Sequence, residues 1–486
     1  MPTTSQTIDE LLREVVDRSA SDLHLKPGRP PLLRVHGALE PAGHPPLEPE
    51  QLASLVDPIV PDRLRERLRG ELAIEFGYSL TNVSRFRASV FVQRGALAAV
   101  FRRVPIDFPS LEEWGLPPVI GGFGDLPQGL VLFTGPTGSG KSSTLAAIIR
   151  QIARTRAVHV VTIEDPIEFL ILDDRAAISQ REVGTDTPSY PLALRNALRQ
   201  DPDVIMVGEM RDEETIRTVL TAAETGHLVF STLHTNGAVQ TVDRVLDSFP
   251  ERGHRQVRQQ LAMVLEAVVS LQLVPRQDGA GMVAAVEILR RTPRASKLIF
   301  KGDLDALQEE IESSVSYHKM QSMNQSLAAL VLHGTVSKDT ALARSANPAD
   351  LDLCLRKVLF AANPTGGQEG DPMAECTSDY SKIVELQEVK KLYDELQERH
   401  LREIAERDGE IAALREQLTA ETPTAGDPRA EKLLQENQRL AKQLHLVRVD
   451  YEGKFERLNA RLRELSGKGA TEPVADPGER RGFFRR

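Results

Sequence analysis

The pattern of hydrophobic positions predicts an α/β domain between residues 119 and 290. Short apolar runs recur there at Leu130–Phe133, Val158–Ile163, Val204–Val207 and Leu228–Phe230. Between these runs lie amphipathic segments long enough for helices, at Ser143–Ala153, Leu192–Gln200 and Glu213–Glu224. Apolar strands that alternate with helices are typical of a parallel sheet covered on both faces.

The regions on either side follow other patterns. Residues 1–108 begin with a short helical pattern and continue with strand-like stretches punctuated by prolines, which predicts a small α+β domain. Prolines then mark a linker at 109–118. Residues 291–362 are predicted to form a mainly helical subdomain.

The C-terminal region is predicted to be a separate tail. Residues 363–379 have the composition of a linker, and residues 380–466 are highly charged and helical. Residues at 3-4 spacing in its second half indicate a coiled-coil seam, formed by Leu433, Asn437, Leu440, Leu444, Val447, Tyr451, Leu458 and Leu465. The alternative is a solvated single helix, and residues 467–486 are predicted to be a disordered basic terminus. We expect the tail to be an accessory element that pairs helices and serves oligomerisation or docking. Truncation after about Pro364 would then leave the core intact.

Composition narrows the class of protein. The 486 residues suffice for about three domains, and the net charge of −10 argues against a general nucleic-acid binder. Two cysteines cannot form a disulfide framework or a four-cysteine zinc site, as expected of a reducing compartment. No apolar run reaches the roughly 18 residues of a membrane span, and the N-terminus lacks the pattern of a signal peptide. A cytoplasmic protein is therefore expected.

The strongest chemical signal is a phosphate-binding loop between the first apolar run and the following helix. It matches the pattern in full with Gly135, Pro136, Thr137, Gly138, Ser139, Gly140, Lys141 and Ser142. Its glycines let backbone N–H groups surround a phosphate at the positive end of the helix. Lys141 is expected to reach the β- and γ-phosphates of ATP, and the Ser142 hydroxyl to bind Mg²⁺.

The next three predicted strands also carry ionisable residues. Glu164 follows the second strand, Glu209 comes shortly after the third, and His234 follows the fourth, which begins after His227. Ligands of open parallel sheets bind outside the carboxyl ends of the strands, so we expect these groups to lie beside the phosphates. A carboxylate there can support Mg²⁺ or orient the attacking water, and an imidazole can contact the γ-phosphate. Glu164 and Glu209 are alternative general bases, and Ser142 and Glu209 are the expected metal residues.

Three arginines of the N-terminal domain are a further candidate. Arg85, Arg87 and Arg102 lie on strand-like stretches, where they could offset the charge that builds up on a transferred phosphoryl group. Taken alone, arginines on a strand are more often a solvated face.

Five segments together resemble the hallmarks of the type II/IV secretion ATPase superfamily. Besides the phosphate-binding loop, they are Ala20–Leu25, Thr162–Phe169, Asp201–Asp212 and Thr225–Asn236. Within that superfamily the chain is similar to the type IV pilus retraction ATPases of the PilT and PilU branch. The absence of a Cys-x-x-Cys zinc module favours this branch over the assembly ATPases. In the segment that corresponds to the PilT retraction motif, residues 294–299, only Leu298 and Ile299 are retained, which leaves a PilT-like or a PilU-like role open.

The resemblance implies an architecture and a function. The core would be RecA-like, the N-terminal domain PAS-like, and the protein a homo-hexamer that binds ATP and Mg²⁺ between these domains. Arg87 and Arg102 would be the family's paired arginines, with Arg85 the weaker match. The motor would power pilus retraction at the cytoplasmic face of the inner membrane, peripheral to the membrane, with a platform protein and a paralogous retraction ATPase as partners and no nucleic acid. Two alternatives are an ATP-binding adaptor subunit of a pilus or type II secretion machine and a DNA-handling RecA-like motor.

Overall fold

The structure is a computed structural model that describes residues 7–81, 83–362, 378–420 and 428–465. Contacts between Cα atoms divide the chain into two units. The first comprises Met1–Val274 and Met282–Ser313, and the second comprises Pro275–Gly281 and Ser314–Arg486. The predicted terminus 467–486 and all but the last two residues of the predicted linker 363–379 lie outside the described residues.

The N-terminal domain of the first unit is built on a six-stranded antiparallel sheet with the order β3-β2-β1-β6-β5-β4. The strands are β1 (Asp22–Leu25), β2 (Leu32–Val35), β3 (Ala38–Pro41), β4 (Ala73–Leu80), β5 (Ser84–Gln93) and β6 (Ala96–Arg103). The helices are α1 (Ile8–Asp17), α2 (Pro49–Val56) and α3 (Asp62–Glu71). Their apolar residues share one core with the fully buried Phe86 and Phe101 of the sheet, so the predicted α+β domain is confirmed.

The second domain of this unit contains a seven-stranded sheet with the order β13-β12-β7-β11-β10-β8-β9. Its strands are β7 (Gly129–Thr134), β8 (His159–Glu164), β9 (Ala177–Glu182), β10 (Val204–Val207), β11 (Leu228–Leu233), β12 (Leu265–Pro275) and β13 (Met282–Arg290). The six strands from β12 to β9 pair in parallel. Every residue of β7, β10 and β11 is buried, which explains their unbroken apolar runs.

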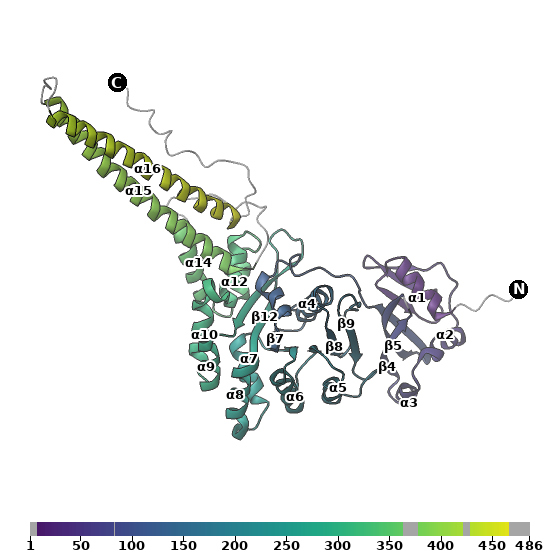
Figure 1. Cartoon of the computed structure of the whole chain (residues 1–486). Coiled ribbons are helices and arrows are strands. Elements are labelled where there is room, and N and C mark those ends of the chain that lie inside the picture. The colour runs from purple at the N-terminus through teal and green to yellow at the C-terminus, as the bar shows by residue number, and fades with distance from the viewer. Residues whose placement is uncertain (1–6, 82, 363–377, 421–427, 466–486) are drawn as a thin grey trace. The chain divides into compact units, whose positions relative to one another are not determined.

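Helices cover both faces of this sheet. Figure 1 shows α4 (Lys141–Thr155) on one side and α5 (Tyr190–Ala197) and α6 (Glu213–Glu224) on the other. Ile148 and Ile149 of α4 share the main core cluster with Val131 and Phe133 of β7. The predicted parallel sheet with helical covers is therefore confirmed.

The first unit extends farther than the predicted boundary at residue 290. Helices α7 (Ala238–Asp247) and α8 (His254–Val264) precede β12, and α9 (Pro293–Lys301) and α10 (Leu304–Ser313) follow β13. Helix α9 packs against α8, and α10 packs against α9 and α7. Because of these contacts, residues 291–313 belong with the sheet domain and not with the later helices.

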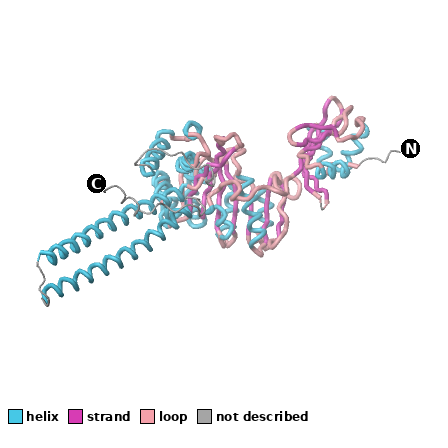
Figure 2. Tube along the Cα trace, turned by 90° about the horizontal axis from the view of Figure 1, so that it is seen from above, coloured by secondary structure: helices cyan, strands magenta, loops and turns pink. Residues whose placement is uncertain are grey.

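The second unit combines a small helical domain with a long helical hairpin. The helices of the small domain are α11 (Val315–His318), α12 (Met323–Leu332), α13 (Lys338–Arg344) and α14 (Pro348–Ala362). Helices α15 (Tyr380–Ala420) and α16 (Pro428–Leu465) run side by side along their length (Figures 1 and 2).

The seam predicted in the tail is buried within a single chain. Leu444 and Tyr451 of α16 and Ile411 of α15 are each at most 8% exposed. The His400 ring stacks on Tyr451 with a centroid distance of 4.5 Å, and the Tyr451 hydroxyl donates a hydrogen bond to Glu403 at 3.0 Å. The helix–helix contact is thus confirmed, and it needs no second chain because α15 supplies the partner surface.

The start of α15 is part of the small helical domain. The carbonyl oxygen of Ser378 accepts hydrogen bonds from Gln321 Nε2 at 2.9 Å and Ser326 Oγ at 3.1 Å, and the Tyr380 N–H donates to Gln321 Oε1 at 2.9 Å. Gln321, Ser326 and Ser378 are almost completely buried. A chain cut after Pro364 would lose these buried hydrogen bonds of Gln321 and Ser326, so the structure moves the start of the separable tail to about residue 391.

Two truncations should therefore behave differently. A chain that ends after Pro364 should lose about 4–8 °C of apparent Tm, because buried hydrogen bonds of the helical domain are broken. A chain that ends after Lys391 keeps these bonds and should stay within about 2 °C of the full-length protein. Thermal unfolding of the two proteins tests this, and equal Tm values would contradict the boundary.

Candidate nucleotide-binding and catalytic site

The loop between β7 and α4 requires glycine for steric reasons. Gly140, directly before α4, has a φ of +97°, which side-chain-bearing residues rarely adopt. A Cβ atom on Gly135 would lie 2.3 Å from the carbonyl oxygen of Leu271 on β12. The first N–H groups of α4 have no acceptor within the helix, so this loop and helix form an anion-binding site of the predicted kind.

Lys141 places a positive charge inside this loop. Its side chain is buried, and Nζ donates to the carbonyl oxygens of Gly135 at 2.8 Å and Pro136 at 3.0 Å. Burial lowers the pKa of Lys141, whereas the carboxylates of Glu209 and Glu168 oppose this shift. The ammonium group thus shares the electrostatic environment of these carboxylates.

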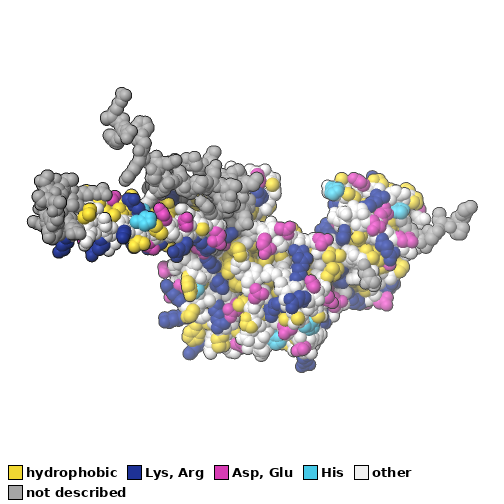
Figure 3. All heavy atoms as spheres, turned by 45° about the horizontal axis from the view of Figure 1, so that its top comes forward, with side chains coloured by type: hydrophobic (Ala, Val, Ile, Leu, Met, Phe, Trp, Pro, Cys, Tyr) yellow, Lys and Arg dark blue, Asp and Glu magenta, His cyan; other side chains and the backbone are white. Residues whose placement is uncertain are grey.

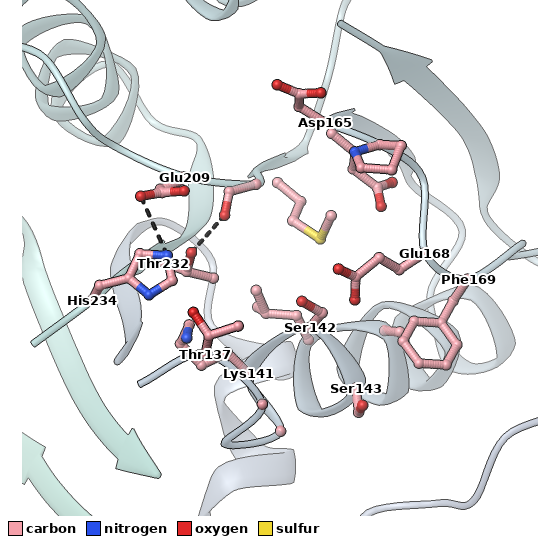
Figure 4. Close-up of a pocket in the computed structure, with 18 of the residues that line it drawn as sticks. Thr137, Lys141, Ser142, Ser143, Asp165, Glu168, Phe169, Glu209, Thr232 and His234 are labelled. Atoms are coloured by element: carbon pink, nitrogen blue, oxygen red, sulfur yellow. Dashed lines mark hydrogen bonds and ion pairs between the residues drawn. The ribbon is translucent and has the colours of Figure 1, made fainter. Parts of the chain in front are cut away.

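A cavity of about 630 Å³ lies above the loop, in the size range of ligand pockets. Residues from the carboxyl ends of β8, β10 and β11 complete it, as the strand order predicts. Figure 4 shows side chains from the loop, the β8–β9 connection and these strand ends around one space. The predicted site residues that line it are Thr137, Gly138, Gly140, Lys141, Ser142, Glu164, Glu209 and His234. Gly135, Pro136 and Ser139 belong to the loop but do not line the cavity.

Glu164 lies at the end of β8 and is 8% exposed. Its Oε1 atom accepts hydrogen bonds from Thr162 Oγ1 at 2.6 Å and from Gln180 Nε2 at 3.0 Å. Burial raises its pKa, and these hydrogen bonds only partly oppose the shift. A carboxylate whose pKa is raised toward neutrality is suited to accept a proton from water.

Glu209 has the opposite electrostatic environment. It forms ion pairs with Arg211 at 2.7 Å and with His234 Nε2 at 3.4 Å, the latter drawn in Figure 4. Burial alone would raise the pKa of Glu209, but the hydrogen bond from Arg211 and the charge of His234 outweigh it and lower the pKa. The two carboxylates therefore differ in pKa, which is the usual basis for different roles in one site.

The lining is suited to a nucleotide that arrives with a divalent cation. Besides Glu164 and Glu209 it contains Asp165 and Glu168, so carboxylates outnumber the buried cation Lys141. Within the described residues there is no cluster of three or more His, Cys, Asp or Glu side chains that could hold a metal by themselves. Mg²⁺ commonly keeps several waters and binds through one or two protein groups plus substrate phosphates, and Ser142 and Glu209 fit that arrangement.

Several lining residues were not singled out from the sequence. Asp165 and Glu168 lie within the segment that carries the family resemblance, so their position was available from the motif. Arg211, which follows β10, likewise lies in such a segment, Asp201–Asp212, whereas Tyr190, at the start of α5, lies in none. Burial raises the pKa of Tyr190, and the nearby carboxylates of Asp165, Glu209 and Glu164 raise it further.

Other predicted residues lie away from the cavity. His227 precedes the amino end of β11, the end opposite the phosphate-binding loop, and its Nδ1 contacts the carbonyl of Ala222 at 3.0 Å. Its predicted contact with the nucleotide is therefore not supported within one chain. Arg87 pairs with Glu75 at 2.7 Å, and Arg102 pairs with Asp22 at 2.8 Å, both inside the N-terminal domain. Neither arginine lines the cavity.

Comparison with known proteins places this architecture among characterised ATPases. Residues 123–343 match the family model described as type II/IV secretion system protein. The chain is 44% identical to the type IV pilus retraction ATPase PilT of Pseudomonas aeruginosa over 341 residues, which cover 70% of this chain and 98% of PilT. It is 39% identical to the type IV pilus ATPase PilU of the same organism, over 72% of this chain and 91% of PilU. A crystal structure of the pilus retraction motor PilT with bound ADP matches with a TM-score of 0.64 and 41% identity, over 72% of this chain and 99% of that one.

The opposite pKa shifts of the two glutamates predict opposite effects on stability. The folded-state pKa of Glu164 is raised, so its contribution to stability is lost as pH rises through that pKa, and Glu164→Gln should raise the apparent Tm at pH 7.5 by about 2–4 °C. The gain should shrink as the pH falls toward the ordinary pKa of a glutamate, because the folded-state carboxyl group is then protonated and the unfolded-state one becomes so.

Glu209→Gln is the matched control. The lowered pKa of Glu209 means that its ionised form stabilises the folded protein above the ordinary pKa, so this variant should lower the apparent Tm at pH 7.5. Thermal scans from pH 4.5 to 8 without nucleotide measure both effects. A shift of the same sign for both variants would contradict this electrostatic description.

Proposed function

Because the chain belongs to the type IV pilus retraction ATPases, a family within the type II/IV secretion ATPases, we propose that it is a hexameric motor that powers pilus retraction and twitching motility. It is a P-loop ATPase. The observation that carries the proposal is one cavity that joins a complete phosphate-binding loop to two carboxylates with opposite pKa shifts. Such a site suits hydrolysis of ATP better than binding alone.

Each side chain has a role in this proposal. The loop amides and Lys141 hold the β- and γ-phosphates, and the Ser142 hydroxyl contributes to the Mg²⁺ shell. The metal would neutralise charge on the phosphates and so reduce their repulsion by the acidic lining. Glu164 accepts the proton of the attacking water, while ionised Glu209 supports the metal and fixes His234, whose imidazole can contact the γ-phosphate.

Arg87 and Arg102 lie away from the cavity, so they can contact the nucleotide only after a change in their position. Arg87 is about half exposed and Arg102 is 72% exposed, so both can exchange their present partners for phosphate. We propose that they reach nucleotide when the N-terminal domain moves or when a neighbouring subunit of the ring presents them. His227, at the other end of β11, is not part of this proposal.

We further propose that the motor works at the cytoplasmic face of the inner membrane. Among the described residues, no helix is long and apolar enough to cross a bilayer, so attachment would be peripheral and through protein partners. A pilus platform protein and a paralogous retraction ATPase are the proposed partners. The α15–α16 hairpin is the proposed docking element, because its two helices already pack against each other and its outer faces carry exposed apolar residues such as Leu401 and Leu446.

Two alternatives remain distinguishable from the motor. An ATP-binding adaptor subunit would hold nucleotide without turning it over. A DNA-handling motor would need a basic track for the phosphate backbone. On the face shown in Figure 3, acidic and basic side chains of the described residues are intermingled, and the net charge of the chain is −10.

Two substitutions separate binding from turnover. Lys141→Ala should abolish hydrolysis and weaken nucleotide binding, because the phosphates lose their buried cation. Glu209→Gln should retain bound ATP but slow hydrolysis by about 10²-fold or more. Steady-state hydrolysis together with equilibrium binding of a fluorescent ATP analogue measures both. A purified wild-type hexamer that binds ATP without hydrolysing it would favour the adaptor.

Deletion of the gene in the source bacterium tests the cellular role. Loss of the motor should abolish or reduce twitching and leave cells with more or longer surface pili. Wild-type protein should restore retraction, whereas the Lys141→Ala variant, expressed at the same level, should not. Normal twitching and pilus length in the deletion strain would contradict a role in retraction.

A further inference from the structure

Strand β9 lies at the edge of the parallel sheet and is unusually polar for this position. Its side chains at 180 and 182 are Gln and Glu, two residues apart and therefore on the same face. Both contact the loop that follows β8, which begins directly after Glu164 and carries Glu168 of the candidate site cavity. Neither residue lines the cavity itself.

Gln180 holds the first part of this loop. Its Nε2 atom donates to Glu164 Oε1 and to the carbonyl oxygen of Phe169, both at 3.0 Å. Its Oε1 atom accepts the N–H of Ile171 at 2.8 Å. One amide side chain thus fixes the carboxylate of Glu164 and the backbone at two further points.

Glu182 connects the same loop to the N-terminal domain. Its Oε2 atom accepts hydrogen bonds from the Ile167 N–H at 3.3 Å and from Arg85 Nη2 at 3.1 Å. The Oε1 atom accepts a hydrogen bond from Thr185 Oγ1 at 3.0 Å. The Arg85 and Glu182 side chains are only 15% and 6% exposed, so their ion pair is shielded from water.

The N-terminal domain is shaped around this ion pair. Arg85 Nη1 donates to Ser79 Oγ on the neighbouring strand β4 at 2.9 Å, which holds the guanidinium in place. Gly77, also on β4, leaves the space that the pair occupies. A Cβ atom there would lie 2.3 Å from Arg85 Nη2 and 2.8 Å from Glu182 Oε1.

We propose that Glu182 is a positioning residue through which Arg85 of the N-terminal domain sets the geometry of Glu164 and of the loop that follows it during ATP hydrolysis. Arg85, and not Arg87 or Arg102, is then the arginine that links the two domains within one chain. The inference rests on the proposed role of Glu164 in hydrolysis.

The physical basis is that a buried carboxylate responds strongly to the loss of its cation. Removal of one partner of a buried ion pair leaves an uncompensated charge that must find water or other donors. The Glu182 carboxylate would turn away from the Ile167 N–H, and the loop attached to Glu164 would shift with it. Small displacements of a catalytic group lower the rate of the chemical step without removing the binding groups.

A double-mutant cycle on Arg85→Met and Glu182→Gln tests the coupling in the full-length protein. Each single variant should lower kcat for ATP by about 5- to 10-fold and change KM by less than about 2-fold, because neither residue touches the nucleotide cavity. The double variant should be no more than about 2-fold slower than the slower single variant. If the decrease of kcat in the double variant equals the product of the decreases in the two single variants, the coupling is overturned.

Gly77→Ala is a second probe that removes no charge. The added methyl group displaces the tip of the flexible Arg85 side chain, so kcat should fall as in Arg85→Met. When Gly77→Ala is combined with Arg85→Met, kcat should fall by less than about 2-fold beyond that of Arg85→Met alone. Arg67→Met breaks an exposed ion pair with Glu71 in the same domain and should leave kcat unchanged.

The outcomes distinguish this inference from the proposed function. Wild-type kcat in folded Arg85→Met and Gly77→Ala proteins, with wild-type hydrolysis intact, would overturn the positioning role alone. Absence of hydrolysis in the wild-type protein would overturn the ATPase mechanism itself. If Arg85→Met does not fold, the kcat of Gly77→Ala decides.

Discussion

A single buried ammonium group faces several carboxylates at the carboxyl edge of the parallel sheet, and the site is organised around this imbalance. Lys141 cannot move far, since its Nζ is held by two loop carbonyls. The carboxylates must therefore be stabilised individually. Glu209 forms ion pairs with Arg211 and His234, whereas the hydrogen bonds that Glu164 accepts from Thr162 and Gln180 come from neutral donors. The difference in donors produces the difference in pKa on which separate catalytic roles depend.

The need to balance each buried carboxylate also applies to residues behind the cavity lining. The loop that follows Glu164 is anchored by apolar side chains such as Ile167 and Ile171, and polar side chains of an edge strand hold its backbone as well. Glu182 can serve this purpose only because Arg85 balances its charge, and Arg85 fits only because residue 77 has no side chain. A nucleotide-binding domain and an N-terminal domain thus share one buried charge pair, which gives domain position a direct route to the catalytic loop.

The α15–α16 hairpin illustrates a different principle. Its polar aromatic cluster, in which His400 stacks on Tyr451, joins the two helices of one chain. Because the seam is filled within one chain, the outer faces of this two-helix arm are available to a partner. About 30% of the chain lies outside the alignment with PilT, which covers 98% of that relative. An added arm of this kind can change partners without altering the catalytic domain.

The sequence by itself determined the phosphate-binding loop, the strand–helix order of the core and the carboxylates at the ends of β8 and β10, because apolar periodicity and glycine spacing are local properties. It did not reveal β9, whose polar composition reflects contacts with a distant loop, nor the change from α8 to β12, where no turn residue separates Val264 from Leu265. It assigned both His227 and His234 to the nucleotide, although the two residues flank opposite ends of one strand. It also favoured Arg87 and Arg102 over Arg85, since three arginines on two paired strands look alike in sequence. Only the tertiary structure decided which guanidinium meets a buried carboxylate of the other domain, because that choice depends on strand pairing, on the space beside Gly77 and on shielding from water.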